Sequence, residues 1–187
     1  MILPIVAYGQ PILRKIAQDI DKDYPDLKKI IADMWETMYF SHGVGLAAPQ
    51  INKSIRLIVI DAAPYGEEDE RAKNFKKAFI NPKIIREEGE EWAFNEGCLS
   101  VPEIREDVYR KSTLTIQYYD ENWNFFEETY DGVMARVIQH EYDHLQGMLF
   151  VDRLSSLRKM MLKRRLNDIL MGKVHTDYRM LFVNSKR

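Results

Sequence analysis

The stretch Gln139-His140-Glu141-Tyr142-Asp143-His144 contains an H-E-x-x-H pattern. On a helix, residues four apart lie on the same face, so His140 and His144 can bind one divalent metal ion together. Glu141 points about 100° away from His140, close enough to reach a water molecule on that metal. A solvated helix that carries two histidines by chance is disfavoured, because the chain has only 4 His. The segment is expected to begin near Asp131-Gly132 and to bury an apolar stripe of Val133, Val137, Ile138 and Leu145.

Two histidines do not complete a catalytic metal site, which usually has three protein ligands and one position open to water. One class of metalloproteases continues as H-E-x-x-H-x-x-G-x-x-H, and this chain follows that pattern to Gly147 but has Phe150 at the third histidine. A second class takes a later glutamate, and no Glu follows Glu141. The other downstream candidates, none with a supporting motif, include Asp152, Asp168 and His175.

Upstream, the only cysteine lies in Glu96-Gly97-Cys98-Leu99-Ser100-Val101-Pro102. A lone cysteine is more often a small buried apolar residue than a metal ligand. Here Gly97 lets the backbone approach closely, and Pro102 stiffens the exit from the segment. A thiolate held on such an extended segment would give a Cys-His-His site with one vacant position. The spacing alone leaves both interpretations open.

A third segment, Gly43-Val44-Gly45-Leu46-Ala47-Ala48-Pro49-Gln50, is apolar and ends in an amide side chain. Taken alone it suits an ordinary turn, because a G-x-G pattern is a weak signal. Together, G-V-G-L-A-A-P-Q, E-G-C-L-S and Q-H-E-Y-D-H occur in the order and approximate spacing of the peptide deformylases. From about Ile5 to about Leu170 the chain resembles a bacterial member of that family.

The resemblance implies a hydrolase that removes the N-formyl group from formyl-methionine at the start of nascent polypeptides. Cys98, His140 and His144 would bind one divalent metal ion, ferrous iron in the cell, although zinc, nickel or cobalt suits the same ligands. A water molecule at the open position would attack the formyl carbon, with Glu141 as general base and then acid. The Gln50 amide and the main-chain N–H of Leu99 would stabilise the oxyanion.

The resemblance also implies how the formyl-methionyl peptide binds. It would lie extended beside the E-G-C-L-S segment and pair with main chain around Val44, Gly45 and Gly97. Arg105 matches a family position near the second side chain of the substrate, although most arginines at such places are simply solvated. The residues expected to line the methionine pocket are Val44, Phe94, Glu96, Val133, Val137 and His140.

The 187 residues, 45% hydrophobic and 30% charged, fit one folded domain. We expect a single catalytic domain over residues 1–172 and a C-terminal tail over residues 173–187. A net charge of −2 gives no overall attraction to DNA. The chain has no apolar run of membrane-spanning length and no convincing signal peptide, and a single cysteine forms no internal disulfide. These features predict a cytoplasmic protein without a membrane partner.

Hydrophobic periodicity predicts an α+β fold, with mainly antiparallel sheets packed around the central H-E-x-x-H helix and with an N-terminal and a C-terminal helix. Residues 62–75, rich in acidic side chains, are expected to form an exposed charged loop. The expected strands are 55–61, 78–85, 91–94, 111–119 and 123–130, and the expected outer helices are 26–39 and 155–171.

Charge is distributed unevenly along the chain. From Arg153 onward there are 10 Lys or Arg against 2 Asp, a net of +8, whereas residues 1–152 carry a net of −10. The basic residues of the final helix alternate with apolar ones, so its outer face is either simply solvated or a binding surface. The resemblance favours the ribosome as the partner of such a surface, since family members use a C-terminal helix in this way.

Two other functions stay in consideration. The chain would be a metalloendopeptidase if a residue other than Cys98 supplied the third ligand, which Phe150 and the missing downstream glutamate disfavour. It would be a non-catalytic, ribosome-associated metal-binding module if catalysis had been lost. The presence of Glu141, Gln50 and Cys98 together disfavours that second alternative.

Overall fold

The computed structural model describes residues 1–183 and confirms the expected α+β class. The larger sheet is antiparallel, with strands in the order β2 (Gly45–Ala47), β3 (Leu57–Asp61), β4 (Lys76–Cys98), β5 (Val101–Tyr119) and β6 (Phe125–Asp131). A parallel pair joins β1 (Ile5–Val6) to β7 (Met180–Leu181). The α-helices within residues 1–183 are α1 (Leu27–Phe40), α2 (Gly132–Leu145) and α3 (Ser156–Leu170).

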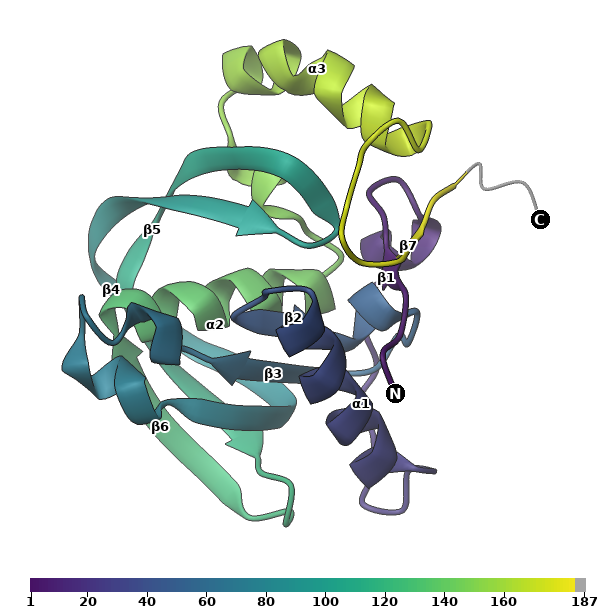
Figure 1. The fold of residues 1–187 in the computed structure, drawn as a ribbon. Coiled ribbons are helices and arrows are strands. Elements are labelled where there is room, and N and C mark those ends of the chain that lie inside the picture. Colours follow the sequence, from purple (N-terminus) through teal and green to yellow (C-terminus); the bar gives the residue numbers. More distant parts are fainter. Residues whose placement is uncertain (184–187) are drawn as a thin grey trace.

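Helix α2, which carries the H-E-x-x-H motif, lies at the centre of the molecule (Figure 1). The C-terminal part of β4 and the N-terminal part of β5 lie on one side of it (Figure 1). Strands β3 and β6 lie on the other side. Because the sheet packs on both sides, nearly every residue of the helix is buried. One face of α2 joins a core cluster with sheet residues that include Ile58, Ile60, Phe79, Leu114 and Ile116.

The start of α2 is where the sequence predicts it, but Asp131 does not cap the helix with its side chain. The Asp131 carboxylate instead accepts a hydrogen bond of 2.6 Å from Arg71. Gly132 has a φ of +57°, a left-handed conformation that glycine adopts with little strain. The glycine therefore lets the chain turn sharply from β6 into the helix.

The strands are longer than the sequence pattern predicts. The two strands expected at 78–85 and 91–94 are one strand, β4, and the segment 111–119 is only the second half of β5. Residues 85–91 are exposed on both faces of this ribbon. A strand that is solvated on both faces loses the apolar–polar alternation by which strands are recognised, so this part of β4 escaped prediction.

The expectation of an exposed loop over residues 62–75 is only partly correct. The segment contains two short 3-10 helices, Ala63–Tyr65 and Glu70–Asn74. Ala72 and Phe75 are buried, so the segment is anchored to the core beneath its charged surface.

Helix α3 lies on the outside of the molecule, and the chain then returns to place β7 beside β1 (Figure 1). The division into a domain over 1–172 and a tail over 173–187 stays a prediction, and positions 184–187 of that tail lie outside the described residues. Among the helices of the described part, none is both long enough and apolar enough to cross a membrane.

The packing of α2 predicts a large difference between two isoleucines. Ile138 is 0% exposed, whereas Ile85 on β4 is 43% exposed. We expect Ile138→Ala to lower the free energy of unfolding by about 2–5 kcal/mol, because it leaves a cavity in the core. Ile85→Ala should change it by about 0.5 kcal/mol or less. Urea unfolding of both variants measures the difference, and equal effects would contradict the central packing of α2.

Candidate metal centre

Cys98, His140 and His144 come together between the end of β4 and the C-terminal half of α2. Each offers one ligand atom, and these atoms all lie within 4.8 Å of one another. The Cys98 Sγ atom is 3.4 Å from Nε2 of His144. Two ligands of a tetrahedral zinc site, with one sulfur and one nitrogen, lie about 3.5 Å apart. The three residues therefore fit a divalent metal ion, and the interpretation of Cys98 as a spectator is disfavoured.

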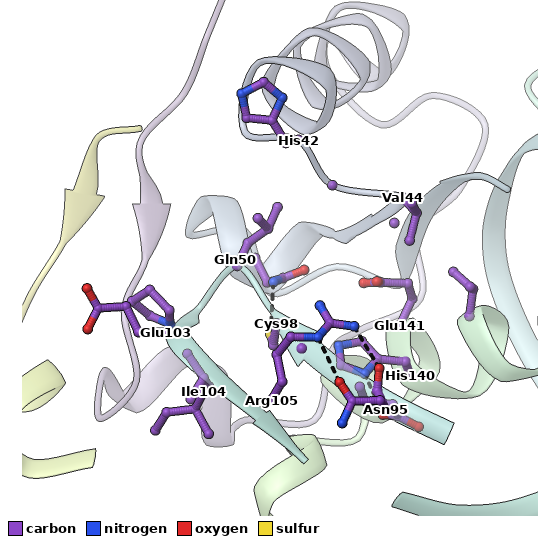
Figure 2. A pocket seen from close by; sticks show the side chains of 18 of the residues that line it. His42, Val44, Gln50, Asn95, Cys98, Glu103, Ile104, Arg105, His140 and Glu141 are labelled. Atoms are coloured by element: carbon purple, nitrogen blue, oxygen red, sulfur yellow. Dashed lines mark hydrogen bonds and ion pairs between the residues drawn. The ribbon is translucent and has the colours of Figure 1, made fainter. Parts of the chain in front are cut away.

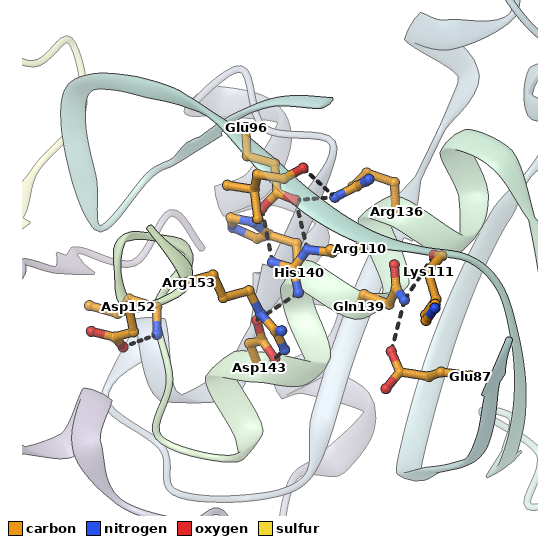
Figure 3. Close-up of polar contacts among 12 residues, drawn as sticks. Glu87, Glu96, Arg110, Lys111, Arg136, Gln139, His140, Asp143, Asp152 and Arg153 are labelled. Carbon is orange, nitrogen blue, oxygen red and sulfur yellow. Dashed lines mark hydrogen bonds and ion pairs between the residues drawn. The ribbon is translucent and has the colours of Figure 1, made fainter. Parts of the chain in front are cut away.

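A buried carboxylate orients the first histidine. Oε2 of Glu96 lies 2.8 Å from Nδ1 of His140, which leaves Nε2 of that ring for the metal. The same carboxylate accepts hydrogen bonds from Arg110 at 2.7 and 2.9 Å and from Arg136 at 3.0 Å (Figure 3). Burial alone would raise the pKa of Glu96, but the bonds with Arg110 and His140 hold that pKa well below its usual range. Glu96 is therefore ionised at neutral pH.

This network changes the role expected for Glu96. The sequence resemblance placed it in the wall of the methionine pocket, and it does border the cavity. Its carboxylate, however, is bound by the two arginines and His140, so its strongest contacts are with the protein.

A second carboxylate, which sequence reasoning missed, lies within the H-E-x-x-H segment itself. Asp143 is 4% exposed and accepts hydrogen bonds from Arg110 at 2.7 Å and from Arg153 at 2.6 Å (Figure 3). Burial would raise the pKa of Asp143, but these two arginines lower it. Arg110 thus bridges Glu96 and Asp143, and it ties β5 to both β4 and α2.

The two histidines differ in their affinity for protons. Burial lowers the pKa of His144 to about 3, so this ring is neutral and ready to bind a metal ion. Burial also acts to lower the pKa of His140, but Cys98 and Glu96 outweigh it and raise that pKa well above its ordinary value. A protonated imidazole does not bind a metal ion, so metal binding by His140 would require loss of that proton.

Glu141 lies beside the metal ligands with one oxygen unsatisfied. Its side chain is buried, and Oε2 has no hydrogen-bond partner among the described residues. Before the charge of a metal is added, burial raises the pKa of Glu141 to about 7. A carboxylate with that pKa can both accept and return a proton at neutral pH. A side chain at position 45 would collide with this carboxylate, which explains Gly45.

The amide of Gln50 is held in one orientation. Its Oε1 atom accepts a hydrogen bond of 2.9 Å from the main-chain N–H of Ala47. Its Nε2 atom donates to Oγ of Ser100 at 3.2 Å and lies 3.6 Å from Sγ of Cys98. The amide NH₂ therefore faces the candidate metal site, as the sequence resemblance implies.

A cavity of about 680 Å³ opens onto Cys98, His140 and Glu141 (Figure 2). Val133 does not line it and is instead buried in the core cluster that contains α2. Arg105 stands at the cavity with its guanidinium held by Asn95, through bonds of 2.9 and 2.7 Å (Figure 2). The other predicted residues that line the cavity are Val44, Gly45, Gln50, Phe94, Glu96, Gly97, Leu99 and Val137.

Several lining residues were not predicted. Tyr65, from the segment expected to be a solvated loop, packs edge-on against Phe94 with ring centroids 5.8 Å apart. Residues 175–178, from the expected tail, also line the cavity. Neither segment carries a periodic pattern or a motif, so the sequence offered no signal for either.

Three of the downstream positions considered for a third ligand do not supply one here. The ring of Phe150 stacks on that of His140, with centroids 6.0 Å apart. Asp152 is bound by Arg14, and the side chain of His175 is 93% exposed. Within residues 1–183, the group of residues that fits a metal ion is the one containing Cys98. The geometry thus disfavours a metalloendopeptidase.

Comparison with known proteins agrees with this site. The family model described as polypeptide deformylase matches residues 2–160. The chain belongs to the peptide deformylase family. The peptide deformylase of Christiangramia forsetii is 55% identical over an alignment that covers 100% of this chain and 99% of the relative. That of Flavobacterium psychrophilum is 54% identical and is covered completely.

Solved structures give the same result for the fold. The crystal structure of a peptide deformylase from Legionella pneumophila matches with a TM-score of 0.80 and 40% identity, covering 92% of this chain and 98% of that one. Peptide deformylases are metal-dependent hydrolases that remove the N-formyl group from nascent polypeptides. This is the activity of the chain, and it confirms the function that the three sequence motifs predict.

The contact between Glu96 and His140 predicts a graded loss of metal. Glu96→Gln removes the charge that orients His140, so we expect metal affinity to fall about 10- to 100-fold. Competition with a chelator measures this affinity. The exposed Glu91, on the same strand, provides a matched Glu91→Gln control that should bind metal normally. Equal affinities for the two variants would show that Glu96 does not support the ligand.

Proposed function

We propose that Cys98, His140 and His144 hold the divalent metal with which this chain hydrolyses formyl-methionyl peptides. The single observation that carries the proposal is the meeting of Cys98 with both histidines of the H-E-x-x-H helix. When bound there, the metal would supply a Lewis acid that polarises the formyl carbonyl and lowers the pKa of water. The ion that we propose for the cell is Fe²⁺, as in the family, because thiolate and imidazole ligands alone suit several transition metals.

Glu141 is the proposed proton carrier. Its unsatisfied buried oxygen faces no protein donor within the described residues, which leaves it available to the attacking water. The carboxylate would take a proton from that water and deliver it to the departing peptide nitrogen. The products are formate and a free N-terminal amine. Burial raises the pKa of Glu141, which favours the return of the proton as well as its uptake.

Two donors are proposed to stabilise the negative charge that develops on the formyl oxygen. The Gln50 amide, fixed by Ala47 and Ser100, is already oriented before substrate binds. The main-chain N–H of Leu99 follows Cys98 directly in the chain. Donors that need no reorientation stabilise a transition state most strongly, because the cost of ordering them is met during folding.

The formyl-methionine side chain is proposed to enter the apolar part of the cavity, beside Val44, Phe94 and Val137. The peptide main chain would pair with the main chain of Gly45 and Gly97, which border the cavity. Arg105, held at the rim by Asn95, is proposed to contact the second residue of the substrate. An apolar pocket separates methionine from similar side chains only modestly, so some breadth is expected.

The exposed face of α3 is proposed to bind the ribosome in the cytoplasm, where formylated chains emerge. Lys159, Lys163 and Arg164 are exposed there, next to the exposed apolar Met160 and Met161. A groove of about 890 Å³ runs along the same helix. Basic side chains beside RNA phosphates release counterions, which makes binding strong at low salt.

Two substitutions separate the proposed roles at the metal. Glu141→Ala should keep close to one metal ion per chain while formate release from formyl-Met-Ala-Ser falls by about a hundredfold or more. Cys98→Ser should instead lose metal, because it removes a ligand. Elemental analysis and a formate assay measure both effects, with acetyl-Met-Ala-Ser as the unreactive control. Parallel loss of metal in Glu141→Ala, or full metal in Cys98→Ser, would contradict the assignment.

Charge reversal tests the proposed ribosome contact. Lys159, Lys163 and Arg164 are changed together to Glu; Arg165 is left intact because it bonds the Glu103 carbonyl. Ribosome cosedimentation should fall sharply and the residual binding should depend less on salt, while hydrolysis of a free peptide stays unchanged. The matched control changes the exposed Lys28, Lys83 and Arg86 to Glu, which alters the net charge by the same amount. Equal losses in both triple variants would leave α3 as a solvated face.

A further inference from the structure

The chain beyond α3 reaches back into the candidate active site. The family model ends at residue 160, yet residues 175–178 line the same cavity as Cys98 and Glu141. This segment is anchored on its C-terminal side by two main-chain hydrogen bonds. The N–H of Ile5 donates to the carbonyl of Arg179 at 2.8 Å, and the N–H of Ala7 donates to the carbonyl of Leu181 at 3.0 Å. Met180 is buried in the core beside them. The segment is therefore a fixed wall of the cavity.

One hydrogen bond connects this wall to the turn that follows the cysteine. The hydroxyl of Tyr178 donates to the main-chain carbonyl of Leu99 at 2.8 Å. The ring of Tyr178 is partly buried and packs against the core cluster that contains Ile5 and Met180, so its hydroxyl is held in place. Leu99 lies between Cys98, a candidate ligand, and Ser100, which accepts a bond from Gln50.

The strands that flank the turn at Leu99 and Ser100 are out of regular register. Gly97 pairs with Arg105, but the next residue, Cys98, pairs with Val101. Residues 102–104 are therefore looped out of the ladder, and Glu103 has a φ of +63°. Contacts from elsewhere in the chain bind the main chain of the turn itself. The N–H of Tyr8, for example, donates to the main-chain carbonyl of Ser100 at 2.8 Å.

We propose that Tyr178 is a positioning residue that holds the Leu99–Ser100 turn, and with it the Cys98 sulfur and the Leu99 N–H, against the H-E-x-x-H helix. The N–H and the carbonyl of Leu99 flank the same Cα, so fixing the carbonyl restricts rotations that would turn the N–H away. Residues 175–178 then contribute to the function of the site and not only to its wall. The consequence for turnover rests on the proposed function, whereas the ordering of the turn does not.

The test uses Tyr178→Phe, which removes the hydroxyl and keeps the ring in the core. The matched control is Tyr39→Phe, which removes a hydroxyl that donates to Asp61 at 2.6 Å, away from the cavity. Hydrogen exchange of a peptide covering residues 97–103 should be about tenfold faster in Tyr178→Phe and unchanged in Tyr39→Phe. The kcat per bound metal on formyl-Met-Ala-Ser should fall about tenfold with KM within about twofold, the range expected for one lost hydrogen bond.

Each alternative result has a defined meaning. Unchanged exchange across 97–103 would overturn the proposal, because the turn would not depend on the hydroxyl. Faster exchange with an unchanged kcat per bound metal would also overturn it, since Tyr178 would then serve stability alone. If the wild-type protein released no formate, the proposed function would fail, and the exchange comparison would still decide whether Tyr178 holds the turn.

Discussion

The buried carboxylate of Glu96 is hydrogen-bonded to His140, Arg110 and Arg136, and the geometry of the active site depends on these contacts. Charges withdrawn from water are costly unless they are paired and fully hydrogen-bonded. Glu96 belongs to β4, Arg110 to β5, and the other two residues to α2. The charges are therefore satisfied only when these three elements assemble in one arrangement. That arrangement also brings the cysteine at the end of β4 to the two histidines of the helix.

The site also contains groups whose arrangement opposes folding. Glu141 is buried with an oxygen that has no hydrogen-bond partner within residues 1–183, and burial shifts its pKa toward neutrality. A structure selected for stability alone would pair this carboxylate or expose it to water. Gly45 likewise gives up a side chain to make room for it. The ion cluster around Glu96 and Asp143 ties β4 and β5 to α2, the helix that carries Glu141.

The sequence was informative wherever chemistry depends on short spacing. Residues 140–144 predict a helix with two ligands on one face, and G-V-G-L-A-A-P-Q and E-G-C-L-S indicate the family. Arg110 was not recognisable, because a charged residue in a strand with charged neighbours has the pattern of a solvated face. Its partner Asp143 lies inside the motif, but only tertiary packing reveals that it is buried. The segment 175–178 has no pattern at all, since its position is set by the distant pairing of β7 with β1.

The pairing of Ile5 with Met180 has a consequence for the order in which the protein forms. During synthesis β1 leaves the ribosome well before β7 is made, so β1 waits without its partner strand. Cys98 and the H-E-x-x-H helix are likewise made before the wall at residues 175–178. A growing chain thus contains all of its candidate metal ligands before the residues that complete its substrate cleft have been made.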